Sequence, residues 1–237
     1  MQRPSYGLDA PGVMRNFAIG AALCAAAAIA LAVAGAAPFV ASALALCAVM
    51  FGATVAAMAH SSRRGKLIER DRVLDGLELR GDETVLDIGC GSGLLLVGAA
   101  KRLPKGRAVG VDVWSQSDRS GHGRETALAN AEAEGVADRI EVVDADMREL
   151  PFADATFDAV VASIALHNLP GRDERERACG EIARVLRPGG RVAVLDFAGT
   201  HDYALAFEDA GLEGITRSGL SLRMYPPVRV VQARRPG

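Results

Sequence analysis

Val85-Leu86-Asp87-Ile88-Gly89-Cys90-Gly91-Ser92-Gly93 decides the fold of this 237-residue chain. An apolar, strand-like run ends in Gly-x-Gly-x-Gly and passes directly into a second apolar run that begins at Leu94. Glycine lets the backbone approach a ligand where a side chain would collide, and the N–H groups at a helix start favour polar ligand groups. The spacing differs from the dinucleotide fingerprint Gly-x-Gly-x-x-Gly, because the third glycine comes one residue early. The stretch therefore predicts a strand–turn–helix unit that binds a ligand at its glycine turn.

Further strands and helices alternate after the glycine turn. Buried strands are predicted over residues 107–113, 140–146, 159–163 and 192–197, and the tail adds two more over 212–218 and 227–233. A helix that includes residues 181–187 is predicted to stop at Pro188-Gly189-Gly190. Short apolar runs that alternate with helical patterns are typical of a parallel sheet covered on both faces.

These motifs resemble those of the class I S-adenosylmethionine-dependent methyltransferases. The glycine turn matches Asp-x-Gly-x-Gly-x-Gly, residues 146–161 resemble the Asp-Ala-x-x-Leu-Pro-Phe…Phe-Asp-x-Val stretch, and residues 186–190 match the late Leu-Arg-Pro-Gly-Gly motif. The resemblance covers residues 80–197. It implies an α/β fold: a Rossmann-like, seven-stranded, mostly parallel sheet with helices on both faces and an antiparallel C-terminal edge hairpin.

The resemblance also implies the cofactor, S-adenosyl-L-methionine, and the residues that bind it. Asp112 at the end of the second strand would accept both ribose hydroxyls. Asp146 would accept from the adenine amino group, and Met147 would lie against the ring. Asp144 is the alternative to Asp146, although the spacing to Leu150 favours Asp146. The predicted cofactor-binding residues are Asp87, Gly89, Cys90, Gly91, Gly93, Asp112, Val113, Asp146, Met147 and Ser163.

His167 follows the fourth predicted strand and is the candidate catalytic residue. A sulfonium already activates its methyl group, so a general base is needed only when the acceptor must lose a proton. A neutral imidazole can take a phenolic or carbon-bound proton near pH 7. The alternative is a histidine that caps the next helix or packs under the sheet. Asn168 is a candidate to hold the acceptor.

The polar segment 114–123 is longer than the two to six residues usual for a strand-to-helix connection. It carries the only tryptophan, Trp114, and two reserve site candidates, Asp118 and His122. The sequence predicts either a lid beside the adenosine site or a solvated insertion with Trp114 against the sheet.

Residues 17–59 contain no charged side chain. One bilayer span needs roughly 20 residues, so the stretch accommodates two helices, about 17–36 and 38–58, with a turn at the central Gly and Pro. Arginine and lysine lie on both flanks and none lies in the turn, which indicates a hairpin with both ends in the cytoplasm. The alternatives are a secretory signal, a soluble hairpin packed on the catalytic domain, and a single span.

The predicted organisation is a cytoplasmic segment (1–16), a transmembrane hairpin (17–59), a linker with an entry helix (60–80) and a catalytic domain (81–237). A net charge of −2, with basic residues scattered and 5% aromatic residues, disfavours nucleic acid as a partner. The four cysteines have no metal-ligand spacing, and neither a metal nor a disulfide is expected.

We therefore expect a methyltransferase held at the cytoplasmic side of the cell membrane, with the lipid bilayer as partner through residues 17–59. The acceptor is expected to be a small lipophilic molecule, quinone-like or a lipid. Two other functions stay open: methylation of a soluble metabolite, and a non-catalytic, membrane-tethered protein for cofactor binding or assembly.

Overall fold

The computed structural model describes residues 4–114 and 123–237. The chain divides into two compact units, which we call the sheet unit and the hairpin unit. The sheet unit comprises Met1–Gly7, Leu67–Leu222 and Pro226–Gly237, and the hairpin unit comprises Leu8–Lys66 and Arg223–Tyr225. The residues before the hairpin thus belong to the same unit as the residues after it.

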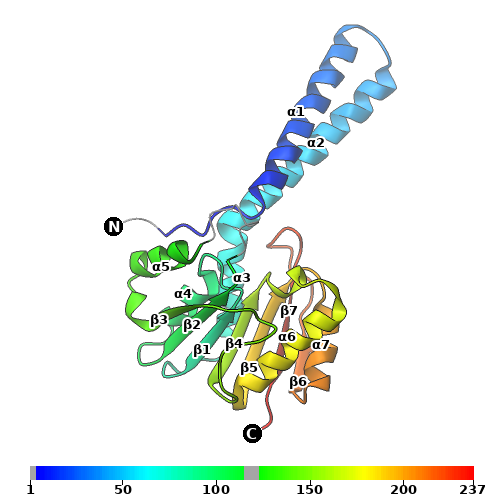
Figure 1. Ribbon diagram of the computed structural model, residues 1–237. Helices are drawn as coiled ribbons and strands as arrows, with labels where there is room; N and C mark the ends of the chain where they lie inside the picture. The colour runs from blue at the N-terminus through cyan, green and yellow to red at the C-terminus, as the bar shows by residue number, and fades with distance from the viewer. Residues whose placement is uncertain (1–3, 115–122) are drawn as a thin grey trace. The chain divides into compact units, whose positions relative to one another are not determined.

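The sheet unit contains a seven-stranded sheet in the order β3-β2-β1-β4-β5-β7-β6 (Figure 1). The first five strands are parallel, and β7 and β6 are antiparallel. The strands are β1 (Thr84–Ile88), β2 (Arg107–Asp112), β3 (Ile140–Asp144), β4 (Phe157–Ser163), β5 (Leu186–Asp196), β6 (Glu213–Arg217) and β7 (Arg229–Arg234). This order confirms the predicted Rossmann-like sheet with its antiparallel C-terminal edge.

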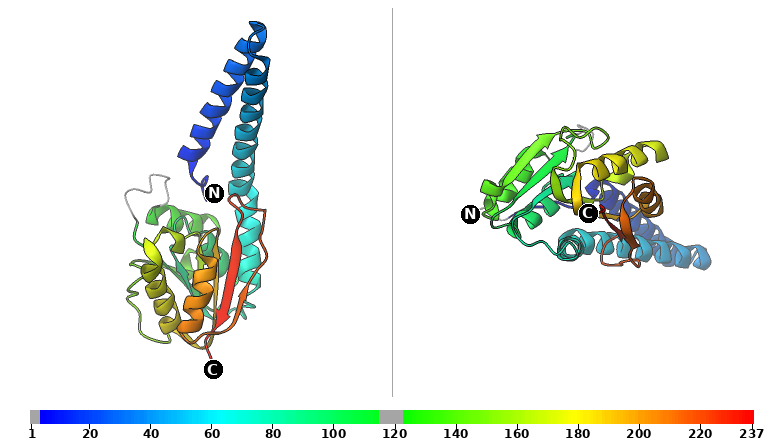
Figure 2. Two further views of the ribbon diagram at one scale, coloured as in Figure 1. Left: turned by 90° about the vertical axis from the view of Figure 1, so that its right-hand side faces the viewer. Right: turned by 90° about the horizontal axis from the view of Figure 1, so that it is seen from below.

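Helices cover both faces of the sheet (Figures 1 and 2). The strand order reverses beside β1, and right-handed crossovers on the two sides of that point place their helices on opposite faces of the sheet. One face carries α3 (Lys66–Asp75), α4 (Leu94–Lys101) and α5 (Arg124–Ala133), and the other carries α6 (Gly171–Val185) and α7 (Thr200–Asp209). Short helical turns occur at η2 (Ala137–Arg139) and η3 (Leu166–Asn168).

The largest side chains of the core lie between the sheet and the helices α6 and α7. Phe157, Ile182, Tyr203 and Phe207 are fully buried there, together with Leu186 at the start of β5. Complete burial of a leucine- or phenylalanine-sized side chain contributes roughly 1.5–3 kcal/mol. This core fixes the strand ends on which the candidate site is built.

The Pro-Gly-Gly segment does not stop a helix as predicted. Helix α6 ends at Val185, and Leu186 already pairs with Phe157 before the ladder is interrupted and resumes at Arg191. The residue before a proline is disfavoured in the helical region, so Arg187 cannot continue the helix into Pro188. The segment instead forms an irregular entry into β5.

The hairpin unit consists of two helices, α1 (Pro11–Val33) and α2 (Pro38–His60), joined by a tight turn (Figure 1). Gly20 lets the helices approach closely, since a Cβ atom there would lie 3.2 Å from the Phe51 ring. Val33 and Phe39 are each 84% exposed. Both helices are long and apolar enough to cross a membrane, by length and composition alone.

The base of the hairpin is closed by polar contacts around Asp9. Its backbone N–H donates to Ser62 Oγ at 2.9 Å, and the Ser62 hydroxyl donates to Asp9 Oδ2 at 3.1 Å. The buried ammonium of Lys66 lies 3.0 Å from Asp9 Oδ1. Ser62 lies in η1 (Ser61–Gly65), the π-helical turn between α2 and α3. The residue that precedes α1 is therefore tied to the residues that follow α2.

Candidate functional site

The candidate site lies at the carboxyl edge of the parallel strands. Strands β1, β2, β4 and β5 all end there, so the residues that follow them are brought together. In open α/β sheets, ligands bind outside this edge at the point where the strand order reverses, which here is between β1 and β4.

The glycine turn after β1 depends on left-handed backbone angles that favour glycine. Gly89, Gly91 and Gly93 have φ values of +66°, +48° and +81°. A Cβ atom at Gly89 would lie 2.5 Å from Ala165 Cβ, so Gly89 is required by packing against the segment after β4. A Cβ atom at Gly91 would meet nothing within 4 Å. Gly91 therefore faces open space, as a ligand cradle requires.

Asp112 ends β2 and is held beside this turn. Its Oδ2 accepts the N–H of Gly91 at 2.9 Å, and its Oδ1 accepts the N–H of Trp114 at 3.0 Å. A carboxylate offers about four acceptor positions, so two remain available for hydroxyl groups. This geometry fits the predicted ribose role. Val113, the next residue, is exposed.

Asp87 is buried at the end of β1, below the glycine turn. Burial raises the pKa of its carboxyl well above the usual range, and the nearby Asp112 charge raises it further. A hydrogen bond from the Leu96 backbone in the first turn of α4 opposes these effects only in part. Burial also raises the pKa of the Cys90 thiol, whose sulfur packs over Gly110. Cys90 is thus a neutral packing side chain.

Asp146 is engaged with a cation that sequence reasoning did not foresee. Arg148 Nε lies 2.9 Å from Oδ1 and Arg148 Nη2 lies 2.5 Å from Oδ2. These hydrogen bonds lower the pKa of Asp146. Arg148 also pairs with Glu174 of α6 at 2.7 Å. Met147 lies beside the glycine turn, with its Cε 3.7 Å from a Cβ atom built on Gly89.

Asp144, the alternative to Asp146 for binding adenine, contacts Trp114 and Arg124. Its Oδ1 accepts from Trp114 Nε1 at 2.6 Å and lies 3.2 Å from Arg124 Nη1. Trp114 is therefore tied to the exposed end of β3. Residues 115–122, including the candidates Asp118 and His122, lie outside the described residues.

His167 lies in η3, shortly after β4, which ends at the half-buried Ser163. Its backbone N–H donates to Asp196 Oδ2 at 3.2 Å, and its Nδ1 lies 3.0 Å from Asp196 Oδ1. The Nδ1 contact is short but is not aligned as a hydrogen bond. The imidazole also packs against Phe197, with ring centroids 4.3 Å apart. His167 is thus oriented by the end of β5.

Asp196 is the residue of this site that sequence reasoning missed. Its fully buried carboxylate accepts the N–H of Phe197 at 2.8 Å and the hydroxyl of Tyr203 at 3.3 Å. Burial, followed by the Asp196 charge, raises the pKa of Tyr203, which remains a neutral donor. An acid that ends a strand at the same edge as the histidine was the available signal.

All four cysteines are free thiols. Within residues 4–114 and 123–237, no three His, Cys, Asp or Glu side chains cluster as metal ligands would.

Residues 86–194 match the sequence family described as a methyltransferase domain. This segment therefore carries a methyltransferase domain, as the resemblance to the class I S-adenosylmethionine-dependent enzymes predicts. For this domain, the match agrees with the predicted family, enzyme class and cofactor, S-adenosylmethionine.

Curated relatives of the methyltransferase domain act on diverse small molecules, as their names state. A 27-O-demethylrifamycin SV methyltransferase of Amycolatopsis mediterranei is 40% identical over 54% of this chain and 43% of its own length. A sterol 4-C-methyltransferase of Caenorhabditis elegans is 35% identical over 55% and 36%. A ubiquinone/menaquinone biosynthesis C-methyltransferase of Roseobacter denitrificans is 35% identical over 54% and 48%. The matches thus span less than half the length of these relatives.

Solved structures agree on the fold of the methyltransferase domain. The [4+2]-cyclase SpnF superposes with a TM-score of 0.62 at 23% identity, over 74% of this chain and 84% of that chain. A geranyl diphosphate methyltransferase in complex with its cofactor gives 0.59 at 18% identity, over 71% and 85%. At these identities the likeness establishes the fold alone.

Replacement of Asp112 by alanine is expected to weaken S-adenosylmethionine binding by about 1–3 kcal/mol, the cost of losing hydrogen bonds to a buried polar ligand. Calorimetric titration measures this change. Asp138→Ala is the matched control, because this exposed aspartate lies before β3, at the opposite edge of the sheet from the glycine turn. Equal affinities of the Asp112 variant and the parent would remove Asp112 from the ribose site.

Replacement of Asp87 by asparagine is expected to raise the melting temperature at neutral pH and to weaken cofactor binding. Since the pKa of Asp87 is raised, the folded protein keeps a proton that the unfolded chain loses between the usual aspartate range and the raised pKa. Stability therefore falls as the pH rises through that window. The asparagine variant should lose this dependence, which melting curves at several pH values detect. If the melting temperatures of variant and parent changed with pH in the same way, the raised pKa of Asp87 would be contradicted.

Proposed function

We propose that this protein transfers a methyl group from S-adenosylmethionine to a small lipophilic acceptor at a membrane surface. The carrying observation is the position of His167, oriented by buried Asp196, at the same sheet edge as the open glycine cradle at Gly91. An open cradle beside an oriented base supports transfer to an acceptor that must be deprotonated.

The cofactor is held by the residues around the glycine turn. When bound, it supplies a methyl group on a positively charged sulfur. Asp112 would accept the ribose hydroxyls while its other lone pairs keep Gly91 in place. A bound cationic ligand would favour the ionised form of Asp87, whose buried carboxyl otherwise keeps its proton, because a nearby positive charge stabilises a carboxylate. Met147 would cover the adenine ring, while Asp146 would receive the adenine amino group through a lone pair not used by Arg148.

His167 would act as the general base on the acceptor. With Nδ1 directed at Asp196, its Nε2 is left to take the proton from a phenol or an acidic carbon. Asp196 is a positioning residue, because its buried carboxylate stabilises the imidazolium and fixes the ring orientation. Phe197 restricts the same ring from its side.

The lipophilic acceptor is supported by two independent observations. The names of the relatives above refer to a rifamycin, a sterol and the biosynthesis of ubiquinone and menaquinone, and sterols and these quinones are lipid-soluble. Both hairpin helices expose large apolar side chains over their length, such as Ile29 and Val33 on α1 and Phe39 and Leu46 on α2. Surfaces of this size are unusual in soluble monomers and favour burial in lipid. We therefore propose that the hairpin lies in the cell membrane and the methyltransferase domain in the cytoplasm, where the cofactor is made.

The function is tested with the full chain in lipid nanodiscs and S-adenosylmethionine carrying a labelled methyl group. A membrane-lipid extract and an aqueous metabolite extract are supplied separately as acceptors. Label in an organic-soluble product supports the proposal, and label only in aqueous products would assign a soluble acceptor. Cofactor binding without labelled product in either extract would indicate a non-catalytic cofactor-binding protein.

The hairpin is expected to retain the full chain in the membrane pellet after an alkaline carbonate wash. A variant with Leu23→Arg and Leu46→Arg should be released into the supernatant, because each arginine near a span centre costs roughly 2.5–3.5 kcal/mol. Both positions are exposed, at 65% and 63%, so the substitutions do not disturb packing within the hairpin. Release of the unaltered chain would place the hairpin outside the bilayer.

A further inference from the structure

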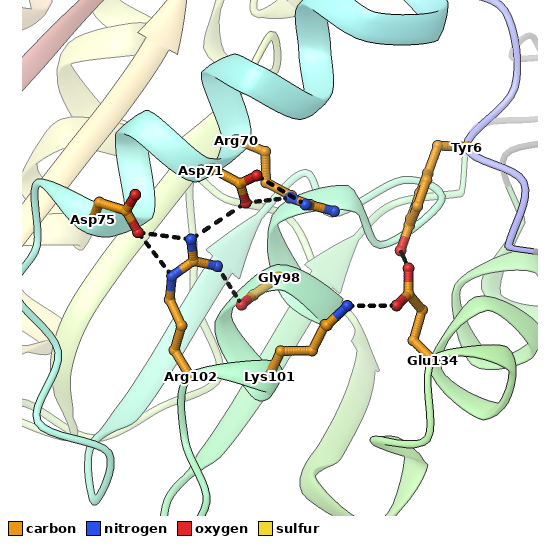
Figure 3. Close-up of polar contacts among 8 residues, drawn as sticks. All are labelled: Tyr6, Arg70, Asp71, Asp75, Gly98, Lys101, Arg102 and Glu134. Carbon is orange, nitrogen blue, oxygen red and sulfur yellow. Dashed lines mark hydrogen bonds and ion pairs between the residues drawn. The ribbon is translucent and has the colours of Figure 1, made fainter.

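The chain segments on either side of the hairpin both belong to the sheet unit, and both are fastened to α4 or to the turn that begins it. Residues 4–7 precede the hairpin, and α3 follows it. Helix α4 begins at the glycine turn, with Gly93 as its N-cap. The contacts at the C-terminal end of α4 are drawn in Figure 3.

Asn130 fastens the first of these segments to the glycine turn itself. This side chain of α5 is buried, and its Nδ2 donates to the carbonyl of Ser92 at 2.9 Å and to the carbonyl of Ser5 at 3.0 Å. Its Oδ1 accepts the N–H of Ser5 at 2.8 Å. Both amide hydrogens and the oxygen are therefore used, and one side chain bridges residues far apart in the sequence.

Tyr6 adds a second connection from the same segment. Its buried side chain donates a hydrogen bond to Glu134 Oε1 at 3.4 Å, and Glu134 Oε2 lies 2.6 Å from Lys101 Nζ at the end of α4. Burial, followed by the Glu134 charge, raises the pKa of Tyr6, so the hydroxyl stays a neutral donor. Figure 3 shows this chain of contacts from Tyr6 to Lys101.

Helix α3 contacts the C-terminal end of α4 through Arg102, the residue that follows α4. Arg102 Nη2 lies 2.7 Å from Asp75 and 3.2 Å from Asp71, and its Nη1 donates to the Gly98 carbonyl at 3.1 Å. Gly98 permits this approach, since a Cβ atom there would lie 2.8 Å from the Arg70 side chain. Figure 3 shows Arg102 between these partners.

We propose that residues 4–7 are a structural part of the cofactor site and that Asn130 is a positioning residue, which couples them to the glycine turn. Ser92 lies between Gly91 and Gly93, two residues with little steric preference, so its carbonyl needs a partner to hold one turn conformation. Cofactor affinity falls in proportion to the fraction of molecules whose turn is competent. The bonds from Asn130 to Ser92 and Ser5 raise that fraction.

The test measures S-adenosylmethionine affinity and turnover of the full chain in detergent micelles. Asn130→Ala removes all three bonds and should raise Kd about tenfold, the scale of a lost buried hydrogen-bond network. Ser5→Pro removes only the Ser5 N–H donor, keeps the Asn130–Ser92 bond and should raise Kd about threefold. At saturating cofactor, kcat should stay within about twofold of the parent. Arg107→Ala, in an exposed pair with Glu141 at 3.8 Å, is the control.

Amide hydrogen exchange distinguishes coupling through Asn130 from a purely structural role of this residue, which would not make exchange depend on the cofactor. Because coupling between sites is reciprocal, added S-adenosylmethionine should slow amide exchange in residues 4–7 of the parent but not of Asn130→Ala. Parent-like Kd values in both variants, or a loss of kcat at constant Kd, would overturn the proposal. A parent chain that does not bind S-adenosylmethionine would overturn the proposed function as well, which separates the two failures.

Discussion

Replacement of His167 by alanine is expected to lower kcat by about 10²–10⁴-fold, the usual contribution of a positioned general base. Affinity for S-adenosylmethionine should change little, because Asp112 is held by the N–H groups of Gly91 and Trp114 and not by this side chain. Single-turnover rates and calorimetric titration separate the two quantities.

Asp196→Asn should reproduce part of this loss through the histidine. The amide keeps the shape of the side chain but removes the charge that stabilises an imidazolium 3.0 Å away. The single-turnover rate should therefore fall, by a smaller factor than in the His167 variant. Asp138→Asn, at an exposed aspartate in η2 before β3, is the matched control. Full activity of the His167 variant would show that transfer needs no base at this position.

Replacement of Gly89 by alanine is expected to destabilise the protein by about 2–5 kcal/mol and to abolish cofactor binding. Left-handed backbone costs an alanine about 1–2 kcal/mol, and an added atom in a packed site costs about 1–3 kcal/mol more. The new Cβ would lie 2.5 Å from Ala165 Cβ. A Cβ atom moves only with its backbone, and here that backbone leads to His167. Thermal or denaturant unfolding measures the loss.

Gly135→Ala is the control for the backbone term alone. Gly135 has φ +70°, similar to the +66° of Gly89, but a Cβ atom there would meet nothing within 4 Å. The Gly135→Ala variant should therefore lose only about 1–2 kcal/mol of its free energy of unfolding. Equal losses at the two glycines would mean that contact with Ala165 contributes nothing. Gly91→Ala should retain stability close to that of Gly135→Ala and yet lose cofactor affinity, because its cradle is open.

Short-range patterns were sufficient for most of the fold. Each strand and helix depends mainly on residues near it in sequence, so apolar runs, glycine turns and the uncharged stretch 17–59 could be recognised without coordinates. The same reasoning located the glycine turn, Asp112 and His167 at one sheet edge, because parallel strands place their carboxyl ends together. It failed at the end of α6, where Leu186 pairs with β4 rather than continuing the helix.

The partners of the site residues were decided by tertiary structure. Asp196 reaches His167 only because β5 pairs with β4, and Arg148 lies beside Asp146 because the loop that carries both residues turns back on itself. Asn130 meets Ser5 across 125 residues of sequence. Such contacts depend on which side chains the packed sheet and helices bring within about 3 Å, the reach of a hydrogen bond. No periodicity along the chain encodes that distance.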